Sequence, residues 1–123
     1  MNKEQVIAFC TTLGMPTQLM NELVACIEVE SNFDQYAIHL NKNPDGTVST
    51  IDYGIVQIND YWHIAGCGKG NDFPSVEYVL SNPQACVKWM ATLFMQGQQK
   101  LWDSYLSGAY LKYMPAQKVA PAN

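Results

Sequence analysis

The chain has 123 residues, the size of one domain and too short for two ordinary hydrophobic cores. Hydrophobic residues make up 48% and charged residues 15%, which is typical of a globular protein and excludes a disordered or fibrous one. The net charge is −4 and the basic residues form no cluster, which argues against electrostatic binding to nucleic acid or to an anionic membrane. No apolar run approaches the roughly 20 residues of a membrane span, so we expect none.

The first half of the chain predicts two helices followed by a small sheet. Apolar residues recur at helical spacing over 6–13, and a glycine and a proline then end the helix. A second helix is expected over 17–31. The run 41–46 is dense in turn-forming residues, and the β-branched stretch 47–58 predicts a hairpin or a three-stranded sheet.

The second half predicts mainly helix. After a short helix over 75–80, Asn82-Pro83 supplies the cap and first-turn proline of a helix that is apolar over most of its circumference. We expect this helix to be buried at the centre of the core. A last helical stretch covers 101–111, and 114–123 is expected to be a frayed tail. The sum is a mostly helical α+β domain over 1–113, with one small antiparallel sheet beside a helical lobe.

The N-terminus and the cysteines bear on the compartment. The start is polar and leads into an amphipathic segment, so we predict no signal peptide in this chain. The four cysteines contain no C-x-x-C pair, which disfavours a zinc site, and we predict no metal and no other cofactor. Two interpretations stay open: four reduced cysteines packed as small apolar residues, or the local disulfides Cys10–Cys26 and Cys67–Cys86, which we favour.

A candidate general acid ends the second predicted helix. Glu30 lies in the run Ile27-Glu28-Val29-Glu30-Ser31-Asn32-Phe33. The negative end of the helix dipole and apolar neighbours both disfavour a charge there, so the pKa of this carboxyl should rise. A carboxyl that stays protonated near neutrality suits general acid catalysis. The alternative interpretation is an ordinary solvated carboxylate at a helix end.

A second carboxylate, Asp52, opens the run Asp52-Tyr53-Gly54-Ile55-Val56-Gln57-Ile58-Asn59. Gln57 and Asn59 share one parity, so on a strand they project from the same face. Polar side chains on a strand face opposite Glu30 would hydrogen-bond a sugar. The alternative is ordinary turn and strand-edge polarity.

The turn before Asp52 also imitates a calcium-binding loop. Asn41, Asn43, Asp45 and Asp52 stand at ligand positions of that pattern. However, an asparagine replaces the first aspartate, Asp52 replaces the bidentate glutamate, and no helix follows. Calcium binding stays a minor alternative, in which Asp52 would be a ligand and not a catalyst.

Taken together, Glu30-Ser31-Asn32-Phe33, the turn 41–46 and the run that begins at Asp52 resemble the lysozyme superfamily. The chain is similar both to c-type lysozymes and to bacterial and phage lytic transglycosylases, closely over 25–59 and more loosely to about 113. The resemblance implies a lysozyme-like fold, a bacterial or phage source, and a monomeric glycosidase. Its substrate would be the β-1,4 bond between MurNAc and GlcNAc in peptidoglycan glycan strands. The place of action would be the cell wall, the periplasm or the outside of the cell, for example as a phage endolysin.

The resemblance also implies roles for single residues. Glu30 matches the catalytic acid of both families, and Asp52 matches the second carboxylate of c-type lysozymes. Trp89, inside the central helix, is expected in the core. The residues expected at the sugar are Gln57, Asn59, Trp62 and Tyr105 by this resemblance, and Trp102 as an aromatic ring for stacking.

Two mechanisms share Glu30. In a retaining lysozyme, Glu30 protonates the glycosidic oxygen, Asp52 attacks or stabilises the anomeric carbon, and water completes hydrolysis. In a lytic transglycosylase, Glu30 is acid and then base, and the sugar's own 6-hydroxyl attacks to leave a 1,6-anhydro end. The presence of Asp52 places hydrolysis slightly ahead. A lysozyme-fold protein that binds glycan without cleaving it ranks third, because both carboxylates are present.

Overall fold

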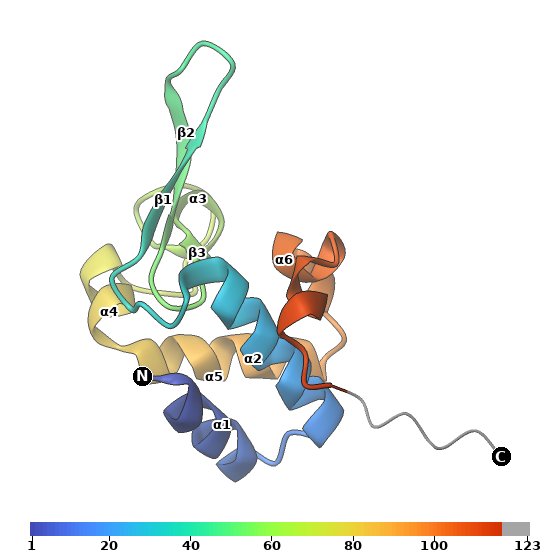
Figure 1. The fold of residues 1–123 in the computed structure, drawn as a ribbon. Helices are drawn as coiled ribbons and strands as arrows, with labels where there is room; N and C mark the ends of the chain where they lie inside the picture. The colour runs from blue at the N-terminus through green and yellow to red at the C-terminus, as the bar shows by residue number, and fades with distance from the viewer. Residues whose placement is uncertain (117–123) are drawn as a thin grey trace, which may run out of the picture.

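The computed structural model describes residues 1–116, so residues 117–123 of the expected tail lie outside the described residues. The architecture is a helical body from which a three-stranded antiparallel sheet projects (Figure 1). This confirms the mostly helical α+β class. In chain order the elements are α1 (Lys3–Thr12), α2 (Thr17–Ser31), β1 (Ile38–Lys42), β2 (Val48–Tyr53), β3 (Ile58–Asn59), α3 (Asp60–His63), α4 (Val76–Ser81), α5 (Pro83–Met95), η1 (Gln99–Leu101), α6 (Asp103–Leu106) and η2 (Ala109–Tyr113).

Local signals in the sequence account for the ends of the first two helices. Asn2 and Gln5 form a reciprocal capping box, in which each side chain accepts a hydrogen bond from the other's backbone N–H, so α1 begins earlier than its apolar pattern indicates. Gly14 takes a positive φ of 77° after α1. Asn32, with φ of 50°, ends α2 in the left-handed conformation that asparagine tolerates. Glu30 is thereby fixed in the last turn of α2.

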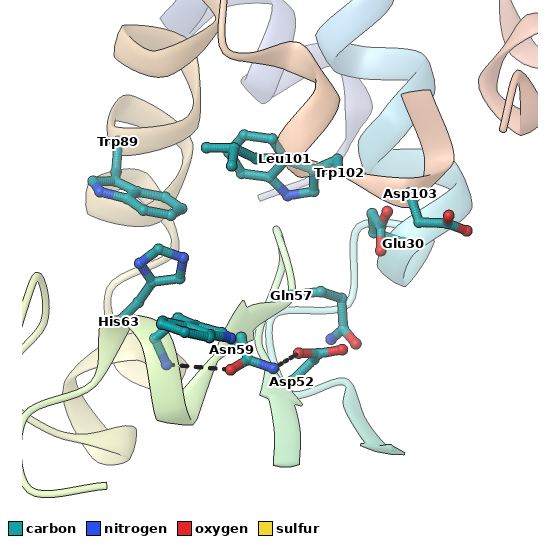
Figure 2. Close-up of a pocket in the computed structure, with 10 residues that line it drawn as sticks. Glu30, Asp52, Gln57, Asn59, His63, Trp89, Leu101, Trp102 and Asp103 are labelled. Atoms are coloured by element: carbon teal, nitrogen blue, oxygen red, sulfur yellow. Dashed lines mark hydrogen bonds between the residues drawn. The ribbon is translucent and has the colours of Figure 1, made fainter. Parts of the chain in front are cut away.

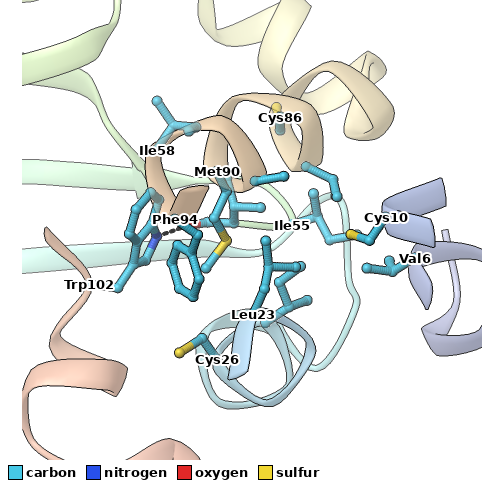
Figure 3. Packing of buried hydrophobic residues seen from close by; sticks show 14 of the residues in the cluster. Val6, Cys10, Leu23, Cys26, Ile55, Ile58, Cys86, Met90, Phe94 and Trp102 are labelled. Carbon is cyan, nitrogen blue, oxygen red and sulfur yellow. Dashed lines mark hydrogen bonds between the residues drawn. The ribbon is translucent and has the colours of Figure 1, made fainter. Parts of the chain in front are cut away.

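Helix α5 lies in the middle of the core, as its apolar pattern predicts. It packs against α1, α2 and the segment between β2 and β3 (Figure 3). Because most of its faces contact other apolar side chains, it joins the helical body to the base of the sheet. Its buried residues are Cys86, Val87, Met90, Ala91 and Phe94.

The stretch 47–58 is not one strand. Strand β2 ends at Tyr53, and a turn over 54–57 leads into β3, with Asp52 paired to Asn59 and Tyr53 to Ile58. The three-stranded sheet predicted here is confirmed, and its last two strands are separated because Gly54 has a φ of 84° and Gln57 a φ of 59°, which reverse the chain. The turn is nevertheless apolar, since its Ile55 and Val56 are fully buried. We call residues 54–57 the buried turn.

The last helical stretch predicted over 101–111 is also interrupted. Instead of one helix, the short elements η1, α6 and η2 follow one another. Gly108, with a φ of 80°, separates α6 from η2. A helix cannot pass through a residue in the left-handed conformation, which the periodicity of the apolar residues does not reveal. The short segments bring residues 101–104 against the end of α2.

The predicted disulfides are absent: all four cysteines are free thiols. Cys10 and Cys26 lie on different sides of the apolar cluster, with Leu23 between them (Figure 3). Cys67 is exposed on the loop after α3, whereas Cys86 is buried in α5 with its Sγ 3.5 Å from the Val79 carbonyl oxygen. Burial raises the pKa of Cys26 and of Cys86 to about 12, so these residues pack as small apolar groups.

Within residues 1–116, no helix combines the length and the apolar character that crossing a bilayer requires.

Candidate active site

A pocket of about 500 Å³ lies where the end of α2 faces the sheet, α3 and α5. It brings together six of the seven residues predicted to form the site, from three separate parts of the chain (Figure 2). Tyr105 is the seventh and is not part of the lining. The residues that line the pocket are Glu30, Asp52, Gln57, Asn59, Trp62, His63, Trp89, Leu101, Trp102 and Asp103.

The neighbour of Glu30 ties α2 to the sheet side of the pocket. The Ser31 hydroxyl donates a hydrogen bond of 2.6 Å to the carbonyl oxygen of Ile55 in the buried turn. Asp52 lies two residues before this turn. This hydrogen bond therefore connects the helix that carries Glu30 to the turn that follows the strand carrying Asp52. In the Glu-Ser pair, the candidate acid is thus followed directly by the residue whose hydroxyl holds the end of α2 against the buried turn.

Burial is the main cause of the raised pKa of Glu30. The Ser104 hydroxyl and the Ser104 backbone N–H both oppose this rise, while the nearby carboxylates of Asp52 and Asp103 add to it. The net direction is upward, so the protonated form of Glu30 is favoured relative to an exposed glutamate. This is the direction that the position at the end of an apolar helix predicts.

Asp52 has a different environment, made of amide side chains. Its Oδ2 accepts a hydrogen bond of 3.0 Å from Asn41 Nδ2, and its Oδ1 accepts one of 2.9 Å from Asn59 Nδ2. Both amide nitrogens also donate to the Thr50 hydroxyl. The three strands of the sheet therefore fix the orientation of the Asp52 carboxylate, which acts here only as an acceptor.

Gln57 lies between the two carboxyl groups in Figure 2, but the buried turn and not a strand positions it. Its Nε2 donates to the carbonyl oxygens of Ala37, at 3.1 Å, and Gly54, at 2.9 Å. The shared parity of Gln57 and Asn59 is therefore not the reason that both line the pocket. Gln57 reaches it because the turn reverses the chain, and its amide holds the turn closed.

Three tryptophans line the pocket with unequal exposure. Trp62 is 56% exposed, so its ring is available for stacking on a ligand, whereas Trp102 is 6% exposed. Trp102 Nε1 donates a hydrogen bond of 2.9 Å to the Val56 carbonyl oxygen, and its ring packs edge-on against Phe94. Trp89 is half-buried and lines the pocket, which corrects its prediction as a purely core residue. Trp89 lies at the boundary between the buried and the exposed faces of α5, which explains the difference.

Sequence reasoning missed three lining residues: His63, Leu101 and Asp103. His63 Nδ1 lies 2.8 Å from Asp72 Oδ2, and its ring packs edge-on against Trp89. The available signal was adjacency, because His63 follows Trp62, and Leu101 and Asp103 flank Trp102. Adjacency alone does not distinguish lining residues from neighbours that point away.

Tyr105 faces another part of the molecule. Its ring stacks on Tyr110 with centroids 4.8 Å apart and packs edge-on against Phe94. It is half-buried between α6 and η2. The structure therefore does not bring Tyr105 to the pocket that holds Glu30.

The residues of the calcium-like pattern form a hairpin. Asp45 Oδ1 accepts hydrogen bonds from the backbone N–H and the hydroxyl of Thr47, and Asn43 Nδ2 donates to the same hydroxyl. Across residues 1–116, no group of three or more histidine, cysteine, aspartate or glutamate side chains has the arrangement of a metal site.

Comparison with known proteins places the fold. No family model and no curated protein matches the chain. Among solved structures, a lysozyme from Litopenaeus vannamei is similar over 83% of this chain and 84% of that one, with a TM-score of 0.57 and 22% sequence identity. The fold is lysozyme-like. This confirms the fold expected from the sequence, and the pocket with Glu30 and Asp52 lies between the helical body and the sheet of that fold.

Proposed function

We propose that the protein is a glycosidase that cleaves the β-1,4 bond between MurNAc and GlcNAc in peptidoglycan, with Glu30 as general acid and base. One observation carries the proposal: a half-buried carboxyl with a raised pKa and a hydrogen-bonded carboxylate line one pocket of a lysozyme-like fold. Pairs of carboxyl groups in contrasting environments are the arrangement that glycoside hydrolysis uses.

In the hydrolytic mechanism, Glu30 donates its proton to the glycosidic oxygen as the bond to the anomeric carbon breaks. Asp52, oriented by Asn41 and Asn59, stabilises the developing positive charge or attacks the anomeric carbon. Glu30, now ionised, then takes a proton from the incoming water, which restores both carboxyl groups. Trp62 supplies an exposed ring against which a sugar can stack, and Asn59 supplies polar contacts.

The second candidate is a lytic transglycosylase, in which Glu30 alone is acid and then base. In this mechanism the 6-hydroxyl of MurNAc attacks the anomeric carbon, loses its proton to Glu30 and leaves a 1,6-anhydro end. One observation favours it: each Asp52 oxygen already accepts an amide hydrogen bond, which makes the carboxylate a weaker nucleophile. We propose hydrolysis first because Asp52 lines the same pocket as Glu30.

For either reaction, the substrate sets the place of action. We propose that the protein acts as a monomer on glycan strands in the cell wall, in the periplasm or outside the cell, in the manner of a phage endolysin. The acidic net charge of −4 offers no long-range attraction to an anionic wall, so recognition would depend on contacts within the pocket.

The decisive experiment is mass spectrometry of the fragments that the protein releases from purified peptidoglycan. Reducing MurNAc ends support hydrolysis, and anhydro-MurNAc ends support the transglycosylase. The comparison variant is Glu30→Gln, and the matched control is Glu28→Gln, which lies on the same helix but contacts Lys3 at 3.2 Å and not the pocket. If the wild type releases no more fragments than Glu30→Gln, the enzyme proposal is wrong and a glycan-binding protein takes its place.

A further inference from the structure

Ser104 is a buried serine next to the residues that line the pocket, but it does not line the pocket itself. It is the second residue of α6 and is 2% exposed. Within residues 1–116, its Oγ is the one buried side-chain oxygen or nitrogen that has no hydrogen-bond partner. A buried hydroxyl without a partner is costly, and such groups in native proteins commonly have a functional reason.

The neighbours of this hydroxyl indicate the reason. Cys26 and Glu30 are four residues apart on α2, so they share the helix face that packs against α6. Glu30 and Asp103, the residue before Ser104, line the same pocket, so the packing of α6 on α2 brings Ser104 to this face. The Ser104 hydroxyl lowers the pKa of both the Cys26 thiol and the Glu30 carboxyl, and the Ser104 backbone N–H also lowers that of Glu30. Ser104 does not line the pocket, so it can act on a bound substrate only through Glu30.

We propose that Ser104 is a positioning residue for Glu30, which its hydroxyl serves in both protonation states. When Glu30 is ionised, the hydroxyl donates a hydrogen bond to the carboxylate. When Glu30 carries the proton, the hydroxyl rotates and accepts from the carboxyl O–H. This inference rests on the proposed function, because an acid that later becomes a base needs a partner that changes from acceptor to donor.

The surrounding charges make this partner necessary. Asp52 on β2 and Asp103 on α6 both face Glu30 and disfavour its ionisation, as does its burial, while Cys26 on α2 is a neutral thiol. Ser104, through its hydroxyl and its N–H, is the residue that favours the ionised form. Removing the hydroxyl should therefore raise the pKa of Glu30 further, so that Glu30 gives up its proton less readily in the first step and its ionised form loses a stabilising neighbour.

The test compares Ser104→Ala and Ser104→Thr with Ser107→Ala. Alanine is smaller than serine and removes an unpaired polar atom, so this variant should fold. Threonine keeps the hydroxyl. Ser107 is an exposed serine that follows the same helix and lies outside the pocket lining, so it is the matched control.

The first readout is the midpoint of the Glu30 titration, followed by carboxyl carbon NMR without substrate. In Ser104→Ala we expect the midpoint to rise by about one pH unit, the size of a charge-assisted hydrogen bond. We expect Ser104→Thr and Ser107→Ala to titrate as the wild type. The proposal is overturned if alanine leaves the midpoint unchanged, or if threonine moves it as far as alanine does.

The second readout is the pH profile of peptidoglycan cleavage. Because catalysis needs protonated Glu30 at the start, the alkaline limb in Ser104→Ala should move to higher pH together with the NMR midpoint. An alkaline limb that stays in place while the midpoint moves would overturn the positioning role. A wild type that cleaves nothing at any pH would overturn the proposed function instead, and the NMR midpoint would still decide whether Ser104 bonds to Glu30.

Discussion

The two sides of the pocket hold their carboxyl groups by opposite means. On the helical side, Glu30 is half-buried, and burial is the largest influence on its pKa. On the sheet side, Asp52 is fixed by the amides of Asn41 and Asn59. One environment disfavours charge and the other supplies donors to it, which is the contrast that the proposed roles of acid and stabilising carboxylate require.

The difference also has a structural cause. An α-helix that ends against a core desolvates its last side chains, whereas the face of a small sheet directs alternate polar residues to one side. Asn41, Asp52 and Asn59 come from three different strands, and strand pairing alone brings them together. Single substitutions can therefore remove one side of this contrast at a time.

The largest effect is expected from Glu30→Gln. The amide keeps the shape but cannot transfer a proton, so cleavage of peptidoglycan should fall by about 10²–10⁴-fold. Glu28→Gln should retain wild-type activity because its side chain is outside the pocket. The measurement is the rate of release of soluble fragments, and equal rates for the two variants would contradict the assignment of Glu30.

Asp52→Asn separates the two mechanisms. In hydrolysis, the loss of the negative charge should lower the rate by about 10²-fold, a typical cost for one electrostatic stabiliser of a transition state. In a transglycosylase the loss should be much smaller. Removing the charge should also lower the pKa of Glu30 and move the alkaline limb of the profile to lower pH. A pH profile identical to that of the wild type would show that the two carboxyl groups do not interact.

The burial of Glu30 predicts a pH-dependent stability as well. Its pKa is higher in the folded state than its ordinary value of 4.5, so the folded state binds more protons and stability falls as the pH rises through the raised pKa. Glu30→Gln lacks this loss. The melting temperature of the variant should therefore exceed that of the wild type more at about pH 8 than at about pH 4, as measured by calorimetry. A constant difference would mean that Glu30 is not desolvated.

The sequence carries enough information for the fold and for the helical side of the contrast. Apolar periodicity located α2 and α5, and Glu30 at the end of an apolar face indicated a raised pKa. The buried turn was not predictable, because its β-branched residues favour a strand and only Gly54 indicates a break. Ser104 was also not predictable, since its burial depends on how short segments pack late in the chain. The free cysteines were one of the two interpretations that the sequence left open, and the spacing of the cysteines could not decide between them.

The buried turn connects the two sides of the pocket, and Trp102 donates a hydrogen bond to it. Replacing Trp102 with phenylalanine removes the donor to the Val56 carbonyl oxygen and leaves that buried acceptor unpaired. The free energy of unfolding should fall by about 1–3 kcal/mol. Trp62→Phe is the control: its ring is exposed, so stability should change by less than about 0.5 kcal/mol. Equal losses in chemical denaturation would show that the hydrogen bond does not stabilise the turn.

The smallest effect is expected from Asp103→Asn, which tests the helical side alone. Asp103 lines the pocket beside Glu30 but is exposed, so solvent screens its charge (Figure 2). Its removal should lower the pKa of Glu30 by less than about one unit, less than Asp52→Asn does, because Asp103 is the weaker of the two influences. The alkaline limb should therefore move slightly to lower pH, opposite in direction to Ser104→Ala. A shift to higher pH would mean that Asp103 acts on Glu30 through something other than its charge.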